Sequence, residues 1–425
     1  IIDNDPSKWQ TYVHLYSSVK LENIYKGIDV IYYYTPDNQI RYDYYIAPNS
    51  DPSQIRMKFE GQDGLELAPN GDLVFKTSLG DIAHGKLFAY QEVNGTQQQI
   101  TCNFKIIDNN VVTFQISNYD KSLPIIIDPT VNYVTYFGRT GTDYSYSTGL
   151  DPNGNAIIAG YTYSADLPVT TGAYQTSRPY SYCGYVTKMN ANGNGLVFCT
   201  YLGASASYNY IYGCGSDQYG NTYVSGYTAA SNFPVTTGAF QTTISTTPDI
   251  FVTKLNTTGT GLIYSTFLGG NNSDYVYGMY VDKDGYAYMT GYTYSTNFPT
   301  SSGAYKTTPP YSGSANVYVT KLNPTGTALA MSSYLGGTSS YSYGYSISAD
   351  PDGNPYVTGY TYATNFPTTP GAYKTTTSYT PATFVTKFNA SGTRLAYSTF
   401  IPASSSTYAY GIAVNSNGEA AITGD

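Results

Sequence analysis

The tripeptide Val-Thr-Lys recurs at a nearly constant spacing in this chain of 425 residues. Two further triplets, Gly-Tyr-Thr and Gly-Ala-aromatic, recur at steps of 65 to 68 residues. The four Val-Thr-Lys copies step by 66, 67 and 66 residues and end at Lys188, Lys254, Lys321 and Lys387. Three independent markers with one period indicate a tandem array over about two thirds of the chain, in which each unit must bury its apolar face on a neighbour.

Each unit of the array has the composition of four short strands. In the third unit, runs rich in Tyr, Thr and apolar residues cover 275–281, 286–293, 317–323 and 328–335. Turn sequences such as Asp282-Lys283-Asp284-Gly285 separate them, and no apolar stripe with helical spacing occurs. Four short antiparallel strands in each repeat are typical of a β-propeller blade, and a β-solenoid is the structural alternative.

We predict four complete propeller blades and part of a fifth. The complete blades cover 143–202, 208–268, 275–335 and 341–401, and the fifth begins at Tyr408. Residues 131–138 are predicted to be a lone fourth strand, because propellers close by combining strands from both ends of the array in one blade. The chain is therefore expected to be a fragment of a longer protein.

Residues 1–130 lack the repeat and are predicted to form a separate domain. Short runs that alternate apolar and polar residues, such as Ile40–Ile46 and Val111–Ile116, are separated by turn sequences such as Pro69-Asn70-Gly71-Asp72. This pattern predicts an all-β sandwich or barrel of about six to nine strands. The predicted domains are thus 1–130 and 131–425.

Charged residues supply only 11% of the chain, against about 25% in average globular domains. Tyrosine supplies 51 residues, so much of the surface is expected to be tyrosine rather than Lys or Glu. Such a surface suits an extracellular repeat protein or one that is buried in an assembly. The net charge of −8 and the absence of a basic cluster argue against nucleic acid as a partner, and no run approaches the ~20 apolar residues of a membrane helix.

The sequence offers little catalytic chemistry. The only histidines are His14 and His84, so a Ser-His-Asp or Cys-His arrangement cannot be built in the repeats. The turn acids Asp282, Asp284, Asp350 and Asp352 are weak calcium candidates. Calcium needs about six to eight oxygen ligands, and these loops are too short to supply them. Asp and Gly also suit a tight hairpin turn for backbone reasons alone, so no metal or cofactor is predicted.

One long loop in each unit carries two recurrent aromatic positions. A repeated ligand-binding ridge is one interpretation; the favoured one is a structural wedge between neighbouring blades, because recurrence in every unit marks what every unit needs. The residues concerned are Phe233, Phe298 and Phe366, with Tyr174, Phe240, Tyr305 and Tyr373. The many other tyrosines could form glycan-stacking or protein-contact patches, or could reflect strand propensity alone.

Three of the four cysteines, Cys183, Cys199 and Cys214, fall within the first two blades. Their spacing matches no zinc or redox pattern. One disulfide among these three, with Cys102 outside it, is one interpretation. Buried free thiols that act as small apolar residues are the other.

Several motifs of the array resemble the SBBP repeat, a family named for a seven-bladed β-propeller. They are Leu262–Gly270, Tyr275–Gly285, Thr290–Thr293, Asn297–Pro299, Gly303–Tyr305 and Val319–Asn323. The first domain is similar to the β-rich module that often precedes such repeats, through Tyr25–Val30, Tyr42–Tyr44, Ala47-Pro48 and Ile127–Pro129. The resemblance implies a secreted or cell-surface bacterial protein with no common enzymatic chemistry. This chain departs from the family in its tyrosine content.

These observations lead to a noncatalytic extracellular structural or adhesive protein, with the propeller as a contact platform. The expected partners are other cell-surface proteins, copies of the same chain in a filament or complex, or glycans. The alternative is a carbohydrate-binding or polysaccharide-active protein whose catalytic part lies outside this chain. A specific binding site is expected to involve residues that differ between blades, because a repeat preserves what all units share.

Overall fold

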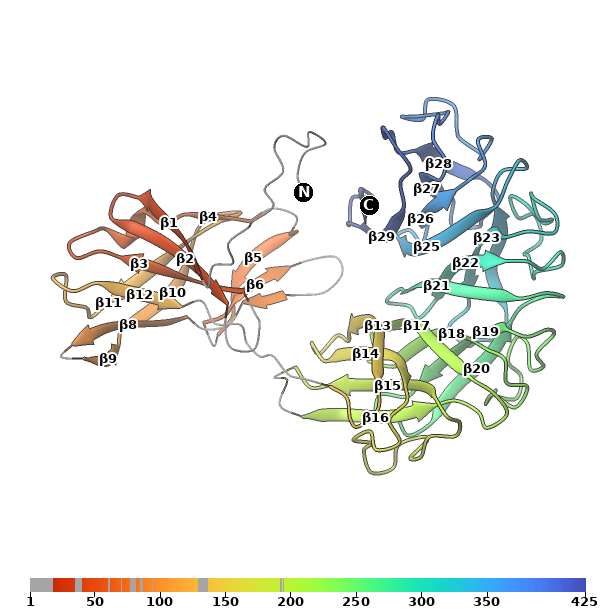
Figure 1. Ribbon diagram of the computed structural model, residues 1–425, viewed down its shortest axis with the longest axis horizontal. Helices are drawn as coiled ribbons and strands as arrows, with labels where there is room; N and C mark the ends of the chain where they lie inside the picture. The colour runs from red at the N-terminus through yellow and green to blue at the C-terminus, as the bar shows by residue number, and fades with distance from the viewer. Residues whose placement is uncertain are drawn as a thin grey trace, which may run out of the picture. The chain divides into compact units, whose positions relative to one another are not determined.

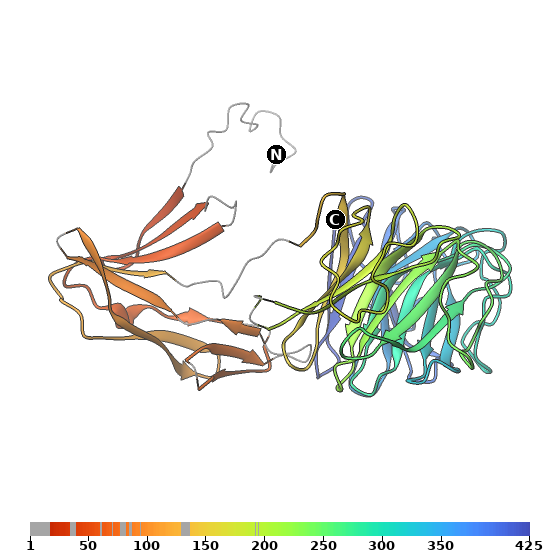
Figure 2. The same cartoon turned by 90° about the horizontal axis from the view of Figure 1, so that it is seen from below.

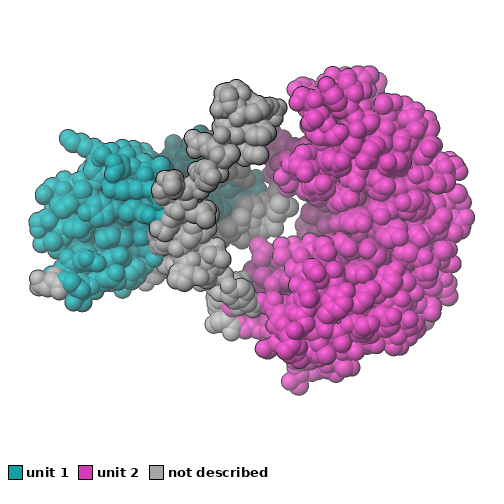
Figure 3. All heavy atoms as spheres, viewed as in Figure 1, with its two compact units in different colours: residues 1–134 teal, residues 135–425 magenta. Residues whose placement is uncertain are grey.

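The protein is described from a computed structural model, which defines residues 18–34, 40–59, 62–69, 71–76, 82–84, 87–93, 95–128, 137–191, 193 and 195–425. The chain divides into two compact units, residues 1–134 and 135–425 (Figure 3). Apart from one 3-10 turn at Pro52–Gln54, the regular elements of the described residues are all strands. The predicted all-β class is confirmed. The described residues contain no helix long and apolar enough to cross a membrane.

The first unit contains three antiparallel sheets. The largest has the order β1-β2-β3-β12-β8-β9 and consists of β1 (Ser18–Tyr25), β2 (Ile28–Tyr34), β3 (Ile40–Ile46), β12 (Ile125–Asp128), β8 (Phe88–Val93) and β9 (Thr96–Gln99). The second contains β10 (Thr101–Asp108), β11 (Val111–Ser117) and β4 (Met57–Lys58). The third contains β5 (Gly64–Leu67), β6 (Leu73–Lys76) and β7 (Ile82–His84).

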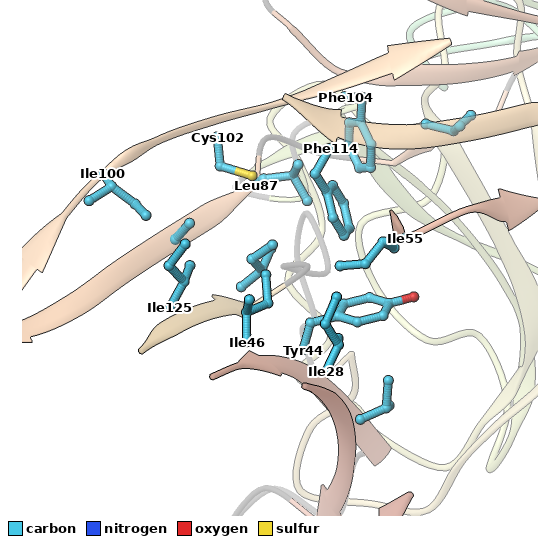
Figure 4. Packing of buried hydrophobic residues seen from close by; sticks show 14 of the residues in the cluster. Ile28, Tyr44, Ile46, Ile55, Leu87, Ile100, Cys102, Phe104, Phe114 and Ile125 are labelled. Atoms are coloured by element: carbon cyan, nitrogen blue, oxygen red, sulfur yellow. The ribbon is translucent and has the colours of Figure 1, made fainter. Parts of the chain in front are cut away.

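One apolar cluster takes residues from all three of these sheets, most of them from the first two (Figure 4). Ile28 and Ile46 of the large sheet are buried with Phe104 and Phe114 of the second. The ring of Tyr44 meets that of Phe114 edge to face across the gap, with 5.4 Å between centroids. Alternation along each strand places these residues on one face, so the two sheets bury a common core as a sandwich does.

The second unit contains four four-stranded antiparallel sheets, each ordered as in the sequence, and one two-stranded sheet. The first two are β13 (Asp143–Leu150), β14 (Ala156–Thr162), β15 (Cys183–Met189), β16 (Leu196–Leu202), and β17 (Asn209–Ser216), β18 (Thr222–Thr228), β19 (Asp249–Leu255), β20 (Leu262–Leu268). The next two are β21 (Asp274–Val281), β22 (Ala287–Thr293), β23 (Asn316–Leu322), β24 (Leu329–Leu335), and β25 (Ser342–Ala349), β26 (Pro355–Thr361), β27 (Ala382–Phe388), β28 (Leu395–Phe400). The last is β29 (Ala409–Val414) with β30 (Ala420–Gly424).

These sheets are the blades of a propeller, arranged side by side in an arc (Figures 1 and 2). The first strand of each blade is innermost, and β13, β17, β21, β25 and β29 contact one another in succession. Three apolar clusters each combine residues of two successive blades. The propeller prediction is confirmed, and the solenoid alternative is wrong because the ladders described here run within blades and are antiparallel. The lone strand predicted at 131–138 lies mostly outside the described residues.

Candidate binding face

The tyrosines of the propeller gather at one end of its blades. In the third blade, Tyr275 of β21 pairs with Tyr292 of β22, and the register shifts between Val276 and Gly278. The residue in the shift is Tyr277, and such a bulge re-aims its side chain. The rings of Tyr275, Tyr277 and Tyr292 are therefore brought together at one end of the blade, and the Asp282–Gly285 turn lies at the other end. The same shift recurs in all five first strands.

The ring contacts repeat from blade to blade. Within a blade, the bulge tyrosine stacks on the second-strand tyrosine, with centroids 5.7, 5.4, 5.7 and 5.4 Å apart in Tyr146–Tyr161, Tyr212–Tyr227, Tyr277–Tyr292 and Tyr345–Tyr360. Between blades, edge-to-face contacts of 4.7, 4.9, 4.7 and 4.8 Å join Tyr161–Tyr210, Tyr227–Tyr275, Tyr292–Tyr343 and Tyr360–Tyr408. Both geometries suit the ring quadrupole, which disfavours a direct face-to-face sandwich.

Further contacts join these rings into one tyrosine network that extends across all five sheets. The bulge tyrosines follow one another along the innermost strands, with centroids 4.6, 5.2, 5.1 and 5.4 Å apart in Tyr146–Tyr212, Tyr212–Tyr277, Tyr277–Tyr345 and Tyr345–Tyr410. The other members are Tyr144, Tyr161, Tyr163, Tyr180, Tyr182, Tyr208, Tyr210, Tyr227, Tyr275, Tyr292, Tyr294, Tyr341, Tyr343, Tyr360, Tyr362 and Tyr408. A continuous aromatic face results.

The bulge phenols at the centre of this face are shielded from water by neighbouring rings. Burial among neighbouring rings raises the pKa of Tyr212, Tyr277 and Tyr345 above the ordinary value of a phenol. Their hydroxyls lie close to one another, as in Tyr212–Tyr227 and Tyr345–Tyr360, where the oxygens are 3.5 Å apart. The face can therefore stack on apolar surface and exchange hydrogen bonds, but its side chains are not suited to acid–base chemistry at neutral pH.

The opposite end of each blade explains the Val-Thr-Lys marker. In three of the four complete blades, the lysine forms an ion pair with the aspartate that begins the first hairpin turn of its own blade. In the third blade, Lys321 Nζ lies over the rings of Tyr286 and Tyr288, 4.3 and 4.7 Å from their centroids. The N–O distances are 3.2 Å in Lys188–Asp151, 3.0 Å in Lys254–Asp217 and 2.8 Å in Lys387–Asp350. Lys188 also donates to the carbonyl of Gly220 in the next blade, at 2.7 Å. In these three blades the marker lysine thus forms a largely buried ion pair, and in the first blade it also ties two blades together.

Most of the carboxylates proposed as calcium ligands already form hydrogen bonds or ion pairs at the turns. Asp282 Oδ1 accepts the N–H groups of Asp284 and Tyr286 at 3.1 and 2.9 Å, and Asp284 pairs with the adjacent Lys283. Although burial opposes it, hydrogen bonds from Lys387 and Asn354 lower the pKa of Asp350. Asp352 is exposed. Across the described residues, no group of three His, Cys, Asp or Glu side chains is placed to hold a metal. His14 lies outside those residues, and only the backbone of His84 is described.

The recurrent loop aromatics lie at the blade boundaries, with one exception. Phe233, Phe298 and Phe366 are buried in the clusters that combine successive blades. Tyr174, Phe240 and Tyr305 pack against those clusters, and their N–H groups donate to carbonyls of the next blade, those of Gly259, Gly326 and Gly392. The prediction is wrong for Tyr373, which is 81% exposed.

All four cysteines are buried, and the structure has them as free thiols, the second of the two interpretations above. Burial raises the pKa of Cys199 to about 11 and the pKa of Cys183 and Cys214 to about 12. Thiols in this state are inert, because the thiolate is the reactive form.

We expect the folded chain to react negligibly with a thiol reagent such as dithionitrobenzoate at neutral pH. Four thiols per chain should react once the protein is unfolded in guanidinium chloride. A chain that gave fewer than four thiols after unfolding, without reductant, would show that a disulfide had formed.

Sequence reasoning missed one pair of buried acids. Asp249 begins β19 and Asp274 begins the first strand of the next blade. A Cβ at Gly269 would lie 2.5 Å from Asp249 Oδ1 and 2.8 Å from Asp274 Oδ2, so the two carboxyl groups flank one point. Burial, together with mutual repulsion at Asp274, raises the pKa of Asp249 to about 6 and of Asp274 to about 7. One sequence difference could have revealed this pair: at the next blade junction, the positions equivalent to Asp249 and Asp274 are occupied by Asn316 and Ser342.

Comparisons with solved structures give only remote likenesses. An ulvan lyase of polysaccharide lyase family PL25 is 11% identical with a TM-score of 0.33, over 91% of this chain and 82% of that one. A prolyl endopeptidase is 10% identical with a TM-score of 0.32, over 94% and 46%. A mutant Synechocystis apocarotenoid oxygenase is 8% identical with a TM-score of 0.31, over 93% and 87%. Similarity this low carries no argument about function.

Family comparisons are more specific. No curated protein sequence matches the chain. Residues 1–130 match a domain of unknown function, DUF7948. Residues 263–299 and 332–367 match the SBBP beta-propeller repeat, in the same blades whose strands and loops are described above. The repeats of the propeller are therefore similar to the SBBP beta-propeller repeat, and the residues before them are similar to DUF7948.

Proposed function

We propose that the propeller is a noncatalytic contact platform of an extracellular, cell-surface protein, and that it binds glycans or other surface proteins through its tyrosine network. The observation that carries this proposal is the continuity of the network across five sheets. Strand propensity would favour tyrosine on any exposed strand position, but it would not align the rings at one end of every blade. Tyrosine provides a large contact area at low entropy cost, together with a hydroxyl group.

The chemistry of the face supports contact rather than catalysis. Burial raises the pKa of its bulge phenols, and the lysine–aspartate pairs lie at the other end of the blades. Binding by stacking and hydrogen bonding needs neither a nucleophile nor a general base. The low charge of the chain suits a surface that contacts neighbours over a wide area.

Alanine substitution in the middle of the network should reduce attachment. We expect Tyr277→Ala and Tyr343→Ala to weaken binding of the purified chain to intact cells and to a glycan array by about tenfold or more, since each removes rings from several contacts. Tyr373→Ala and Tyr219→Ala are matched controls, because these tyrosines are 81% and 73% exposed and lie outside the network.

Circular dichroism would establish that each variant is folded before binding is compared. Equal losses in the network variants and in the controls would contradict the proposal, as would attachment that none of the four substitutions changes.

A further inference from the structure

The tyrosine network is not uniform, because extra tyrosines are added where the first two blades meet. In each complete blade, the last threonine of the second strand pairs with the first residue of the third strand. The residue just before that third strand is a tyrosine in the first blade only. From the first blade to the fourth, it is Tyr182, Pro248, Ala315 and Pro381. Because this cluster occurs in one blade only, it can form a single binding site, whereas a feature shared by all blades would form several.

Tyr182 is the centre of this local cluster. Its ring lies 4.9 Å from that of Tyr163, 6.1 Å from those of Tyr180 and Tyr208, and 5.6 Å from that of Tyr210. Its hydroxyl accepts a hydrogen bond from the hydroxyl of Tyr210 at 3.2 Å. Five aromatic rings are therefore held together by contacts on several sides, which fixes their orientation before a ligand arrives.

The rim of the cluster is exposed. Tyr163 and Tyr180 are 43% and 36% exposed, and the adjoining Tyr144 and Tyr146 are 42% and 48% exposed. The rings of Tyr144, Tyr146 and Tyr161 are nearly parallel, with interplanar angles of 26°, 26° and 17°. Four partly exposed rings beside nearly parallel neighbours form an extended aromatic surface rather than a single pocket.

The charged side chains beside this surface are engaged by loops. The guanidinium of Arg178 donates to the backbone carbonyls of Tyr163 and Ser181. The Asp143 carboxylate accepts hydrogen bonds from the backbone N–H of Arg139 at 2.7 Å and from the Ser164 hydroxyl at 3.1 Å. Asp166 accepts from the Thr140 hydroxyl at 2.8 Å. The exposed tyrosines therefore offer a ligand ring faces and phenol hydroxyls.

We propose that the first-blade patch, formed by Tyr144, Tyr146, Tyr163, Tyr180 and Tyr182, binds a neutral glycan chain. Pyranose rings have an apolar C–H face that stacks on aromatic rings and hydroxyls at their edges that exchange hydrogen bonds with phenols. An anionic glycan would require cations, and Arg178 is already directed to the backbone. This inference rests on the proposed function and assigns it a ligand class and a place.

The test is affinity electrophoresis of the whole chain in gels that contain laminarin, galactomannan or xylan, with alginate and polygalacturonate as anionic comparators. We expect at least one neutral polysaccharide to retard the chain. Tyr146→Ala and Tyr180→Ala should raise its dissociation constant about tenfold, the cost of one lost stacking contact of ~1.4 kcal/mol. Tyr373→Ala, an equally conspicuous exposed tyrosine outside the patch, should leave the constant unchanged.

Three results would overturn the inference. They are no retardation by any neutral polysaccharide, retardation by the anionic ones alone, and equal losses in Tyr146→Ala and Tyr373→Ala. If neutral glycans fail to bind while Tyr277→Ala and Tyr343→Ala still abolish attachment to cells, the glycan assignment fails and the contact platform stands. If neither set of variants changes any attachment, both fail.

Discussion

Replacing Phe298 with alanine is expected to lower the free energy of unfolding of the propeller by about 3–5 kcal/mol, the usual cost of emptying a buried phenylalanine site. Phe298 is 2% exposed and its ring stacks on Tyr318 with 4.6 Å between centroids. The cluster around it combines residues of the second and third blades, so the cavity would weaken a junction and not one loop alone. Urea denaturation followed by tyrosine fluorescence would measure the change.

A matched control exists within the same loop family. Tyr373→Ala changes an exposed ring, so its effect on unfolding should stay within about 0.5 kcal/mol. If Phe298→Ala left the unfolding midpoint unchanged but abolished glycan or cell attachment, the structural explanation of these aromatics would fail. The recurrent loops would then be a binding ridge.

The repeat made the blade architecture predictable. Strands expected at 275–281 and 317–323 are observed at Asp274–Val281 and Asn316–Leu322, shifted by one residue at most at each end. A period of 66 residues and a turn sequence at a fixed offset are local signals, and each blade repeats the evidence of the others. The wedge position of Phe298 followed from the same logic, because every unit must pack on a neighbour.

Features that depend on relations between blades could not be predicted in this way. The tyrosine face results from a bulge at Tyr277 and its equivalents, and alternation alone gives no sign of a bulge. Tyr373 has the same sequence context as Tyr305, yet it is exposed, whereas Tyr305 packs against the cluster of the third and fourth blades. The partners Asp249 and Asp274 are separated along the chain and meet only across a blade junction.

That junction leads to the second prediction, which concerns pH. Asp249 and Asp274 are both fully buried, and each retains an oxygen without a hydrogen-bond partner in the described structure. Their folded pKa values, about 6 and about 7, lie above the ordinary value of 3.8. The folded protein therefore binds protons that the unfolded chain releases. The contribution of this pair to stability is complete below the unfolded pKa of 3.8, falls as the pH rises above it, and is fully lost once the pH has passed through the folded values of about 6 and 7.

The tyrosines that surround the pair do not offset this effect. Asp274 influences buried Tyr318 and Tyr334, whose pKa values are raised by burial, so both phenols stay neutral throughout this range. The aspartates paired with lysine act in the opposite direction: the pKa values of Asp151, Asp217 and Asp350 are lowered, so their contribution disappears in acid. Maximum stability is therefore expected in mildly acidic solution, between these two ranges.

Asp274→Asn isolates the contribution of Asp274. An amide keeps the size of the carboxyl group and cannot ionise, so the variant should lose the Asp274 share of the fall in stability between about pH 4 and pH 7 and keep the share of Asp249. Each unit of pKa displacement corresponds to about 1.4 kcal/mol, so the difference between the two proteins at about pH 8 should amount to a few kcal/mol in favour of the variant. Asp352→Asn, at an exposed turn, should leave the profile unchanged. Thermal unfolding at a series of pH values would show this, and parallel profiles for the native chain and Asp274→Asn would rule out a protonated pair at this junction.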